Sequence, residues 1–346
     1  MQRVERLDER LASLPKPLLQ QSREFRLAAD DCLVVCAGFE DRAIGVLKNA
    51  IAAGGVFTAV IIDYRPIVPE NRLAEMRNVC QKAGLRAIEV IYDRENPADF
   101  GTILNEKISG MAGRVFLDVS AMSRLLIVQS LVALGRRACG FAGCVVAYAE
   151  ATIYPPTQEE VELALRHSAE DPLYSILLLS SGIFDVTVVP ELSSTAVAGD
   201  QTRLVAFPTF STDQLTALRS ELAPSRVTCI HGVPPKPENQ WRTAAIARIN
   251  QLGLAPPDNV LASTLDYRET FDCLVELYNA HSERERILVS PTGSKMQSVA
   301  VGLFRTFIDD VQIVYPTPKE FRSPQNYTRG VGQLYSLDLG AISAEL

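Results

Sequence analysis

Short apolar runs alternate along this chain with longer segments whose apolar residues recur at helical spacing. In the first half the runs begin near residues 32, 56, 86, 114 and 144, with a helical segment between each run and the next. Such runs are typical of buried parallel strands, and the segments between them are typical of crossover helices. The pattern predicts an α/β fold with a parallel, Rossmann-like sheet.

The second half repeats this pattern, with expected strands near residues 203, 226, 260, 287 and 311. Pro69-Glu70-Asn71 opens a helix in the first half, and Pro237-Glu238-Asn239 opens the helix at the matching place in the second. These helices end at Gly84 and Gly253. Such landmarks recur in the same order at offsets of roughly 160 to 172 residues, which favours an internal duplication. Two generic α/β domains that share a tripeptide by chance are the alternative.

The duplication divides the chain into consecutive parts. Leading apolar positions at helical spacing predict an N-terminal arm that prolines interrupt. The apolar segment Leu173–Val189 belongs to the first domain or to an interface, and the alternating residues after Arg329 predict one more strand. The expected parts are a helical arm (1–28), a first Rossmann-like domain (29–192), a linker (193–201) and a second Rossmann-like domain (202–346).

Composition narrows the classes of function. The chain of 346 residues is 47% hydrophobic, enough to bury large cores, and its net charge of −7 argues against broad nucleic-acid or membrane-surface binding. Its seven cysteines form no CxxC pair, so we expect reduced, buried thiols. No signal peptide or membrane-spanning run stands out. The sequence therefore predicts a cytoplasmic protein.

The stretch Ser290-Pro291-Thr292-Gly293-Ser294-Lys295 joins an apolar run to a helical segment. A strand, a loop of small residues with a lysine, and a helix N-terminus form a geometry that holds phosphate. The P-loop pattern GxxxxGK[ST] is absent, so this is a different loop. At the matching place the first half carries DVSAMSR, from Asp118 to Arg124.

Ligands of open parallel sheets bind beyond the carboxyl ends of the strands. Hydroxyls, backbone N–H groups and single cations at these ends suit phosphodiester groups. A serine or threonine before a helix is equally a routine N-cap, whereas a cation early in a helix opposes the helix dipole unless an anion is near. The candidate ligand-binding residues are Gly38, Phe39, Arg65, Ser120, Ser123 and Arg124 in the first half, and Thr209, His231, Thr292, Gly293, Ser294, Lys295 and Thr317 in the second.

The run PTGSKMQSVAVGLF resembles the TGGTK-type loop and following helix of CARF (CRISPR-associated Rossmann fold) domains. Two such units in one chain resemble SAVED-type sensors of cyclic oligonucleotides in antiviral defence. The resemblance implies that Thr292, Gly293, Ser294 and Lys295 contact a nucleotide phosphate or ribose. By duplication, Ser120, Ser123 and Arg124 would serve the facing half-site. The second glycine of the motif is Ser294 here, and the first half lacks the matching threonine and lysine.

The leading hypothesis is a sensor of a cyclic oligonucleotide that acts through a separate effector protein, because no nuclease, protease or membrane module stands out. A metal-independent, ring-nuclease-like phosphodiesterase and a non-catalytic structural subunit of a defence complex are the alternatives. CAGFED and AFPTFS stand where GxGxxG would follow each first strand, which disfavours a dinucleotide oxidoreductase. We expect no cofactor and no metal; association of two chains into a homodimer stays open.

Overall fold

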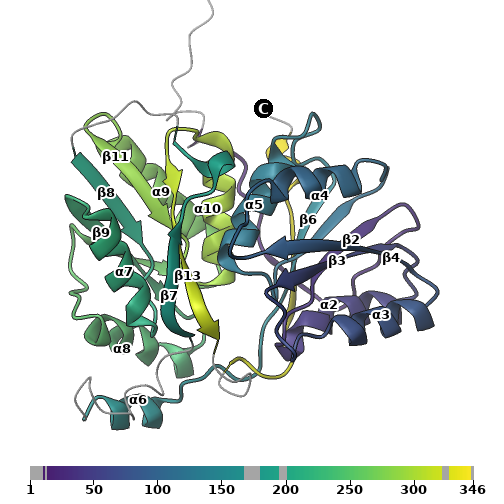
Figure 1. Cartoon of the computed structure of the whole chain (residues 1–346), viewed down its shortest axis with the longest axis horizontal. Helices are drawn as coiled ribbons and strands as arrows, with labels where there is room; N and C mark the ends of the chain where they lie inside the picture. The colour runs from purple at the N-terminus through teal and green to yellow at the C-terminus, as the bar shows by residue number, and fades with distance from the viewer. Residues whose placement is uncertain (1–10, 12–13, 167–179, 195–200, 322–326, 344–346) are drawn as a thin grey trace, which may run out of the picture. The chain divides into compact units, whose positions relative to one another are not determined.

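The computed structural model of the chain describes residues 11, 14–166, 180–194, 201–321 and 327–343. The chain divides into two compact units, which we name by their sheets (Figure 1). The seven-stranded unit comprises Pro15–Pro155 and Tyr327–Leu346, and the five-stranded unit comprises Met1–Leu14 and Pro156–Asn326. Both units are α/β domains with Rossmann-like sheets.

Five parallel strands form the main part of the seven-stranded sheet, and two antiparallel strands extend it on one side. The strands are β1 (Gln20–Ser22), β2 (Cys32–Cys36), β3 (Thr58–Arg65), β4 (Arg86–Asp93), β5 (Val115–Asp118), β6 (Cys144–Ala149) and β14 (Leu334–Asp338). Their order across the sheet is β1-β14-β6-β5-β2-β3-β4.

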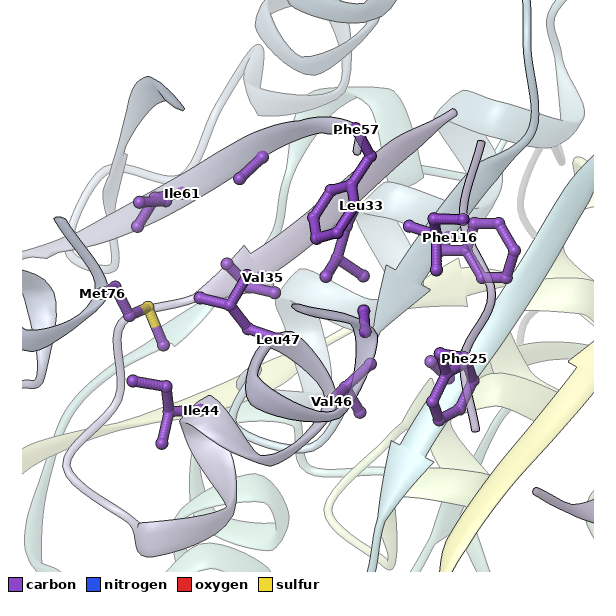
Figure 2. Close-up of a cluster of buried hydrophobic side chains, with 14 of the residues drawn as sticks. Phe25, Leu33, Val35, Ile44, Val46, Leu47, Phe57, Ile61, Met76 and Phe116 are labelled. Atoms are coloured by element: carbon purple, nitrogen blue, oxygen red, sulfur yellow. The ribbon is translucent and has the colours of Figure 1, made fainter. Parts of the chain in front are cut away.

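Helices cover both faces of this sheet. They are η1 (Asp41–Ile44), α2 (Gly45–Ala52), α3 (Leu73–Lys82), α4 (Phe100–Ile108), α5 (Arg124–Gly135) and the short α11 (Gly340–Ser343). Figure 2 shows Leu33, Val35 and Ile61 of the strands packed against Val46 and Leu47 of α2. Right-handed crossovers place α4 and α5 on the opposite face. Helix α5 is buried along its length, which explains why it is apolar on every side.

The strands of the five-stranded sheet are all parallel. They are β8 (Gln201–Ala206), β9 (Arg226–Val233), β10 (Asn259–Ser263), β11 (Glu285–Ser290) and β12 (Gln312–Ile313), in the order β10-β9-β8-β11-β12. Counted in chain order within each unit, both sheets place their parallel strands as third, second, first, fourth and fifth. A duplication predicts this shared order, and the duplication itself stays a prediction.

The helices of the five-stranded unit are α6 (Gln158–Ala164), η3 (Pro190–Leu192), α7 (Thr212–Leu222), η4 (Pro237–Asn239), α8 (Trp241–Ile249), α9 (Tyr267–His281) and α10 (Lys295–Phe307). An antiparallel ribbon of β7 (Ser180–Thr187) and β13 (Tyr315–Phe321) completes the unit (Figure 1). Leu215 and Leu218 of α7 pack against Leu204 on one sheet face. Helices α9 and α10 lie on the other face, joined by the edge-to-face rings of Phe271 and Phe304.

Some expected boundaries differ from this arrangement. The strand expected after Arg329 exists as β14, but it pairs with β6 rather than joining the second sheet. Its alternating side chains indicate a strand without saying which sheet edge it meets. Gln20–Ser22, expected within a helical arm, is a strand paired with β14, because Pro15 and Pro17 prevent the helix from continuing. The other residues of that arm up to residue 13, apart from Leu11, and the linker residues 195–200 lie outside the described residues.

Candidate functional site

In both sheets the first and fourth strands are neighbours, and the connections after them leave toward opposite faces. This is the topological switch point, where open α/β sheets bind ligands beyond the carboxyl ends of their strands. In the five-stranded unit the loops after β8 and β11 meet there. The Thr292 Oγ1 hydroxyl donates a hydrogen bond of 2.8 Å to the Phe207 carbonyl, which joins the two loops.

The loop after β11 ends in a capping box at the start of α10. Ser294 is the N-cap: its Oγ accepts a hydrogen bond from the Gln297 backbone N–H at 3.1 Å, and Gln297 Oε1 accepts from the Ser294 N–H at 2.9 Å. Ser294 Oγ also donates to the Thr264 carbonyl at 2.7 Å. The hydroxyl hydrogens of Thr292 and Ser294 are therefore used inside the protein. These two hydroxyls therefore hold the conformation of the loop and do not donate hydrogen bonds to a ligand.

Gly293 occurs where a side chain does not fit. A Cβ at this position would lie 2.4 Å from Gln297 Oε1 and 3.0 Å from Phe207 Cβ. Real Cβ atoms do not approach other atoms so closely, so an alanine would displace the Gln297 carboxamide from the capping box. The glycine of the PTGSK run thus lets the loop pack tightly on the first turn of α10.

Lys295 is the first residue of α10, and only 7% of its surface is exposed. A helix N-terminus carries partial positive charge, which favours anions and disfavours cations. A largely buried lysine at this position concentrates positive charge beside backbone N–H groups. The arrangement suits a phosphate group, whose oxygens accept hydrogen bonds from both.

The side chains of the other candidates in the five-stranded unit form hydrogen bonds within that unit. Thr209 Oγ1 donates to Gln214 Oε1 at 3.3 Å and accepts from the Ser211 N–H at 3.1 Å, which holds the turn before α7. The imidazole of His231 is buried, and its Nε2 lies 2.9 Å from Asn259 Oδ1. Thr317 lies in β13, where its hydroxyl meets that of Thr187 at 2.8 Å. Thr317 therefore sits in the antiparallel ribbon and not directly after β12.

The seven-stranded unit has a related switch point between β2 and β5. A Cβ at Gly38 would lie 3.0 Å from Ala121 Cβ, so the loops after these strands also touch. Ser123 is the N-cap of α5 and accepts a hydrogen bond from the Leu126 N–H at 3.3 Å. Arg124 is the first residue of that helix, the position that Lys295 holds in α10.

The remaining candidates of this unit contact residues that sequence reasoning did not select. Ser120 Oγ donates to Asp118 Oδ1 and accepts from the Ala149 N–H at 2.8 Å. The ring of Phe39 meets the ring of Tyr327 edge to face, with centroids 4.7 Å apart. Tyr327 follows β13 far along the chain, so no local signal relates it to Phe39.

Sequence reasoning did not select Tyr64 and Arg94, which lie at the same edge of the sheet. Tyr64, between Asp63 and Arg65 at the end of β3, accepts a 2.5 Å hydrogen bond from the Ser123 N–H, and burial raises its pKa well above the ordinary value. Arg65 forms a 3.1 Å ion pair with Asp63. Burial lowers the pKa of Arg94, which follows β4, although the neighbouring Glu95, Tyr64 and Tyr327 act in the opposite direction. The position of Tyr64 at the end of an apolar run could have identified it as a candidate from the sequence.

A segment that begins at Tyr327 ties the C-terminal part of the chain to the loop after β2. Thr328 Oγ1 donates to Glu40 Oε2, and the Gly330 N–H donates to Asp41 Oδ2 at 2.8 Å. Glu40 in turn holds the buried Arg42 at 2.6 Å. These bonds fix the shape of the loop that follows Gly38 and Phe39.

Among the residues that the structure describes, no group of three or more His, Cys, Asp or Glu side chains could hold a metal ion. Within the same residues, no helix combines the length and the apolar character needed to cross a membrane.

Comparison with known proteins gives no family. No family model matches the chain, and no curated protein matches it. Among solved structures, the chain is similar to a Type III CRISPR defence DNA nuclease activated by cyclic oligoadenylate, with 12% identity, a TM-score of 0.48 and 82% of this chain covered. The likeness spans 65% of that nuclease's length.

Two other structures have lower scores. The L-sorbose reductase of Gluconobacter frateurii, solved with NADPH and L-sorbose, is 12% identical, has a TM-score of 0.27 and is covered over 99% of its chain and 87% of this one. The cytoplasmic domain of a prokaryotic cation chloride cotransporter is 10% identical at a TM-score of 0.26, with 93% of this chain and 100% of that one covered. All these TM-scores are below 0.5, so no function is taken from the comparisons.

Proposed function

We propose that this protein is a sensor of a cyclic oligonucleotide second messenger and acts in antiviral defence through a separate effector protein. The observation that carries the proposal is the start of α10 at the switch point of the five-stranded sheet. There a capped helix N-terminus and the largely buried Lys295 stand beside a glycine that allows close approach. These groups suit the phosphate of a phosphodiester.

The ligand class follows from charge and from the loop sequence. A chain with a net charge of −7 repels long polyanions, so a compact nucleotide held by one local cation fits better than DNA or RNA. The resemblance of PTGSKMQ to the CARF loop supports a cyclic oligonucleotide within that class. Ser123 and Arg124 hold equivalent places at the start of α5, which supports a related site in the seven-stranded unit and a duplicated origin.

The decisive experiment is a calorimetric titration with cyclic di-, tri-, tetra- and hexanucleotides and their linear counterparts. We expect one of the cyclic forms to bind, and Lys295→Met to weaken its binding about 10- to 100-fold, because a charge-assisted contact to phosphate is lost. Methionine keeps much of the volume of this largely buried side chain. Lys319→Ala, which removes an exposed lysine of the same unit, is the matched control and should bind like the wild type.

Two results would contradict the proposal: no binding to any nucleotide of the panel, or equal binding by Lys295→Met and the wild type. Chromatography of the nucleotide after incubation separates a sensor from a phosphodiesterase, because a sensor leaves the ring intact. Thermal melting of both variants shows whether a loss of binding reflects a loss of folding.

A further inference from the structure

In the side-chain carboxamide of Gln297, the oxygen accepts a hydrogen bond and the nitrogen makes none. Only 2% of the residue is exposed, and its Oε1 accepts the Ser294 N–H at 2.9 Å. Its Nε2 is buried and has no acceptor among the residues that the structure describes. Buried donors are almost always hydrogen-bonded, and leaving one unbonded is unfavourable, so this amide requires an explanation.

The capping bond fixes which way the carboxamide points. If the amide were turned over, Nε2 would face the Ser294 N–H, donor against donor, and the capping box would be lost. The unbonded group is therefore an NH₂ donor held in one orientation at the first turn of α10.

Two glycines border this carboxamide. A Cβ at Gly293 would lie 2.4 Å from Gln297 Oε1. A Cβ at Gly232, at the end of β9, would lie 2.7 Å from Thr264 Cγ2, 3.5 Å from Oε1 and 3.7 Å from Nε2. Neither glycine has a side chain that could supply an acceptor to this amide. Gly232 is half-buried, so the protein surface lies close to the carboxamide, although Nε2 itself is covered.

We infer that Gln297 is a ligand-binding residue, whose Nε2 donates a hydrogen bond to a phosphate oxygen at the first turn of α10. The helix N-terminus and Lys295 favour an anion there, and the carboxamide adds a neutral donor of fixed direction. The inference rests on the proposed function only for the identity of the nucleotide. The phosphate contact itself follows from the geometry of the five-stranded unit.

The seven-stranded unit lacks this donor. The third residue of α5 is Leu126, and its N–H bonds to Ser123 as the Gln297 N–H bonds to Ser294. The N-cap serine and the first-turn cation occur in both units, whereas the amide occurs in one. The contact therefore distinguishes the α10 site from its counterpart at α5.

Gln297→Glu isolates the donor. Glutamate keeps an oxygen that accepts the Ser294 N–H, so the capping box survives, but it replaces the NH₂ group by an oxygen that repels phosphate. We expect the nucleotide found in the titration panel to bind at least about tenfold more weakly to this variant. The matched control is Gln240→Glu, which makes the same change at the exposed N-cap of α8 and should bind like the wild type.

A second measurement requires neither a cyclic nucleotide nor a variant that folds. The side-chain carboxamide signal of Gln297 is followed by ¹H–¹⁵N NMR in the wild-type chain while inorganic phosphate, and separately adenosine 5′-monophosphate, is added. We expect this signal to shift with both additions and the Gln240 signal to stay in place. An unmoved Gln297 signal overturns the inference, whatever the variants do.

The outcomes separate the two proposals. If no cyclic nucleotide binds but phosphate moves the Gln297 signal, the phosphate contact stands and the sensor function is wrong. If a cyclic nucleotide binds and both the affinity of Gln297→Glu and the Gln297 signal are unchanged, the sensor function stands and the phosphate contact is wrong.

Discussion

Glu285→Ala is expected to lower the free energy of unfolding of the five-stranded unit by about 3–5 kcal/mol, because it leaves a buried arginine without its anion. Arg203 and Glu285 lie at the amino ends of β8 and β11, with side chains 6% and 10% exposed. Their contact is bidentate, since Arg203 Nε meets one carboxylate oxygen and Nη2 meets the other at 3.1 Å. The third bond of the guanidinium goes to Thr228 Oγ1 at 2.8 Å, so Arg203 joins three neighbouring strands.

Tryptophan fluorescence reports this unit selectively, because Trp241 is the single tryptophan of the chain and lies in α8. For a unit of this size the expected loss corresponds to a fall in melting temperature of roughly 6–20 °C. Glu162→Ala removes an exposed glutamate of the same unit, whose Oε1 accepts a hydrogen bond from Gln158 Nε2 at 2.9 Å, and is the matched control, with little expected change. Similar melting of Glu285→Ala and the wild type would show that the pair contributes nothing to stability.

The same pair gives a pH dependence. The hydrogen bond from Arg203, followed by its charge, lowers the pKa of Glu285 below its ordinary value of 4.5, although burial acts in the opposite direction. The stabilisation is therefore complete above pH 4.5 and is lost as the pH falls through the folded-state pKa. The difference in stability between the wild type and Glu285→Ala should accordingly shrink below pH 4.5.

Gly113→Ala is expected to destabilise the seven-stranded unit by about 3 kcal/mol, because it forces backbone atoms apart. A Cβ at Gly113 would lie 2.4 Å from the Asp30 carbonyl oxygen and 2.7 Å from the Asp31 nitrogen. These atoms cannot rotate away as a side chain could, and the Gly113 N–H itself donates to the Asp30 carbonyl at 3.0 Å. The contact lies just before β2 and β5, the two strands of the switch point.

Hydrogen exchange of the β2 and β5 amides measures this effect in the unit concerned. Gly110→Ala is the matched control three residues earlier, where a Cβ would meet nothing within 4 Å. This control should stay within about 1 kcal/mol of the wild type. Equal protection of β2 in the two variants would mean that the loop yields and that the close approach is not required.

The alternation of apolar runs and helical segments was sufficient to predict an α/β chain with two Rossmann-like sheets. It could not assign β14, since alternation in Leu334–Asp338 describes a strand with two faces and any open edge can accept it. The apolar residues up to Val189 were expected in the first domain or at an interface. Part of them, β7, pairs with β13 in the five-stranded unit, because antiparallel pairing joins segments that no local pattern connects.

The candidate site was predictable where its geometry depends on residues close together in the sequence. The run from Ser290 to Lys295 does lie between a buried strand and a helix N-terminus. The spacing of Ser294 and Gln297 is that of a capping box, a signal present in the sequence that would have identified Gln297. Tertiary contacts such as those of Tyr327 could not be foreseen, because they depend on where β14 returns. The roles of the thirteen candidate residues as ligand contacts stay predictions.

Because β14 pairs with β6 in the seven-stranded sheet, the two units cannot be separated by simple truncation of the chain. The chain passes between the units three times, at residues 14/15, 155/156 and 326/327, so one proteolytic cut cannot release either unit. A fragment that ends at residue 192 would leave β6 as a bare edge prone to aggregation. Ile153 pairs with Arg329 in an antiparallel bridge, so a short splice from Pro155 to Tyr327 would remove Pro156–Asn326 and keep every strand of the seven-stranded sheet.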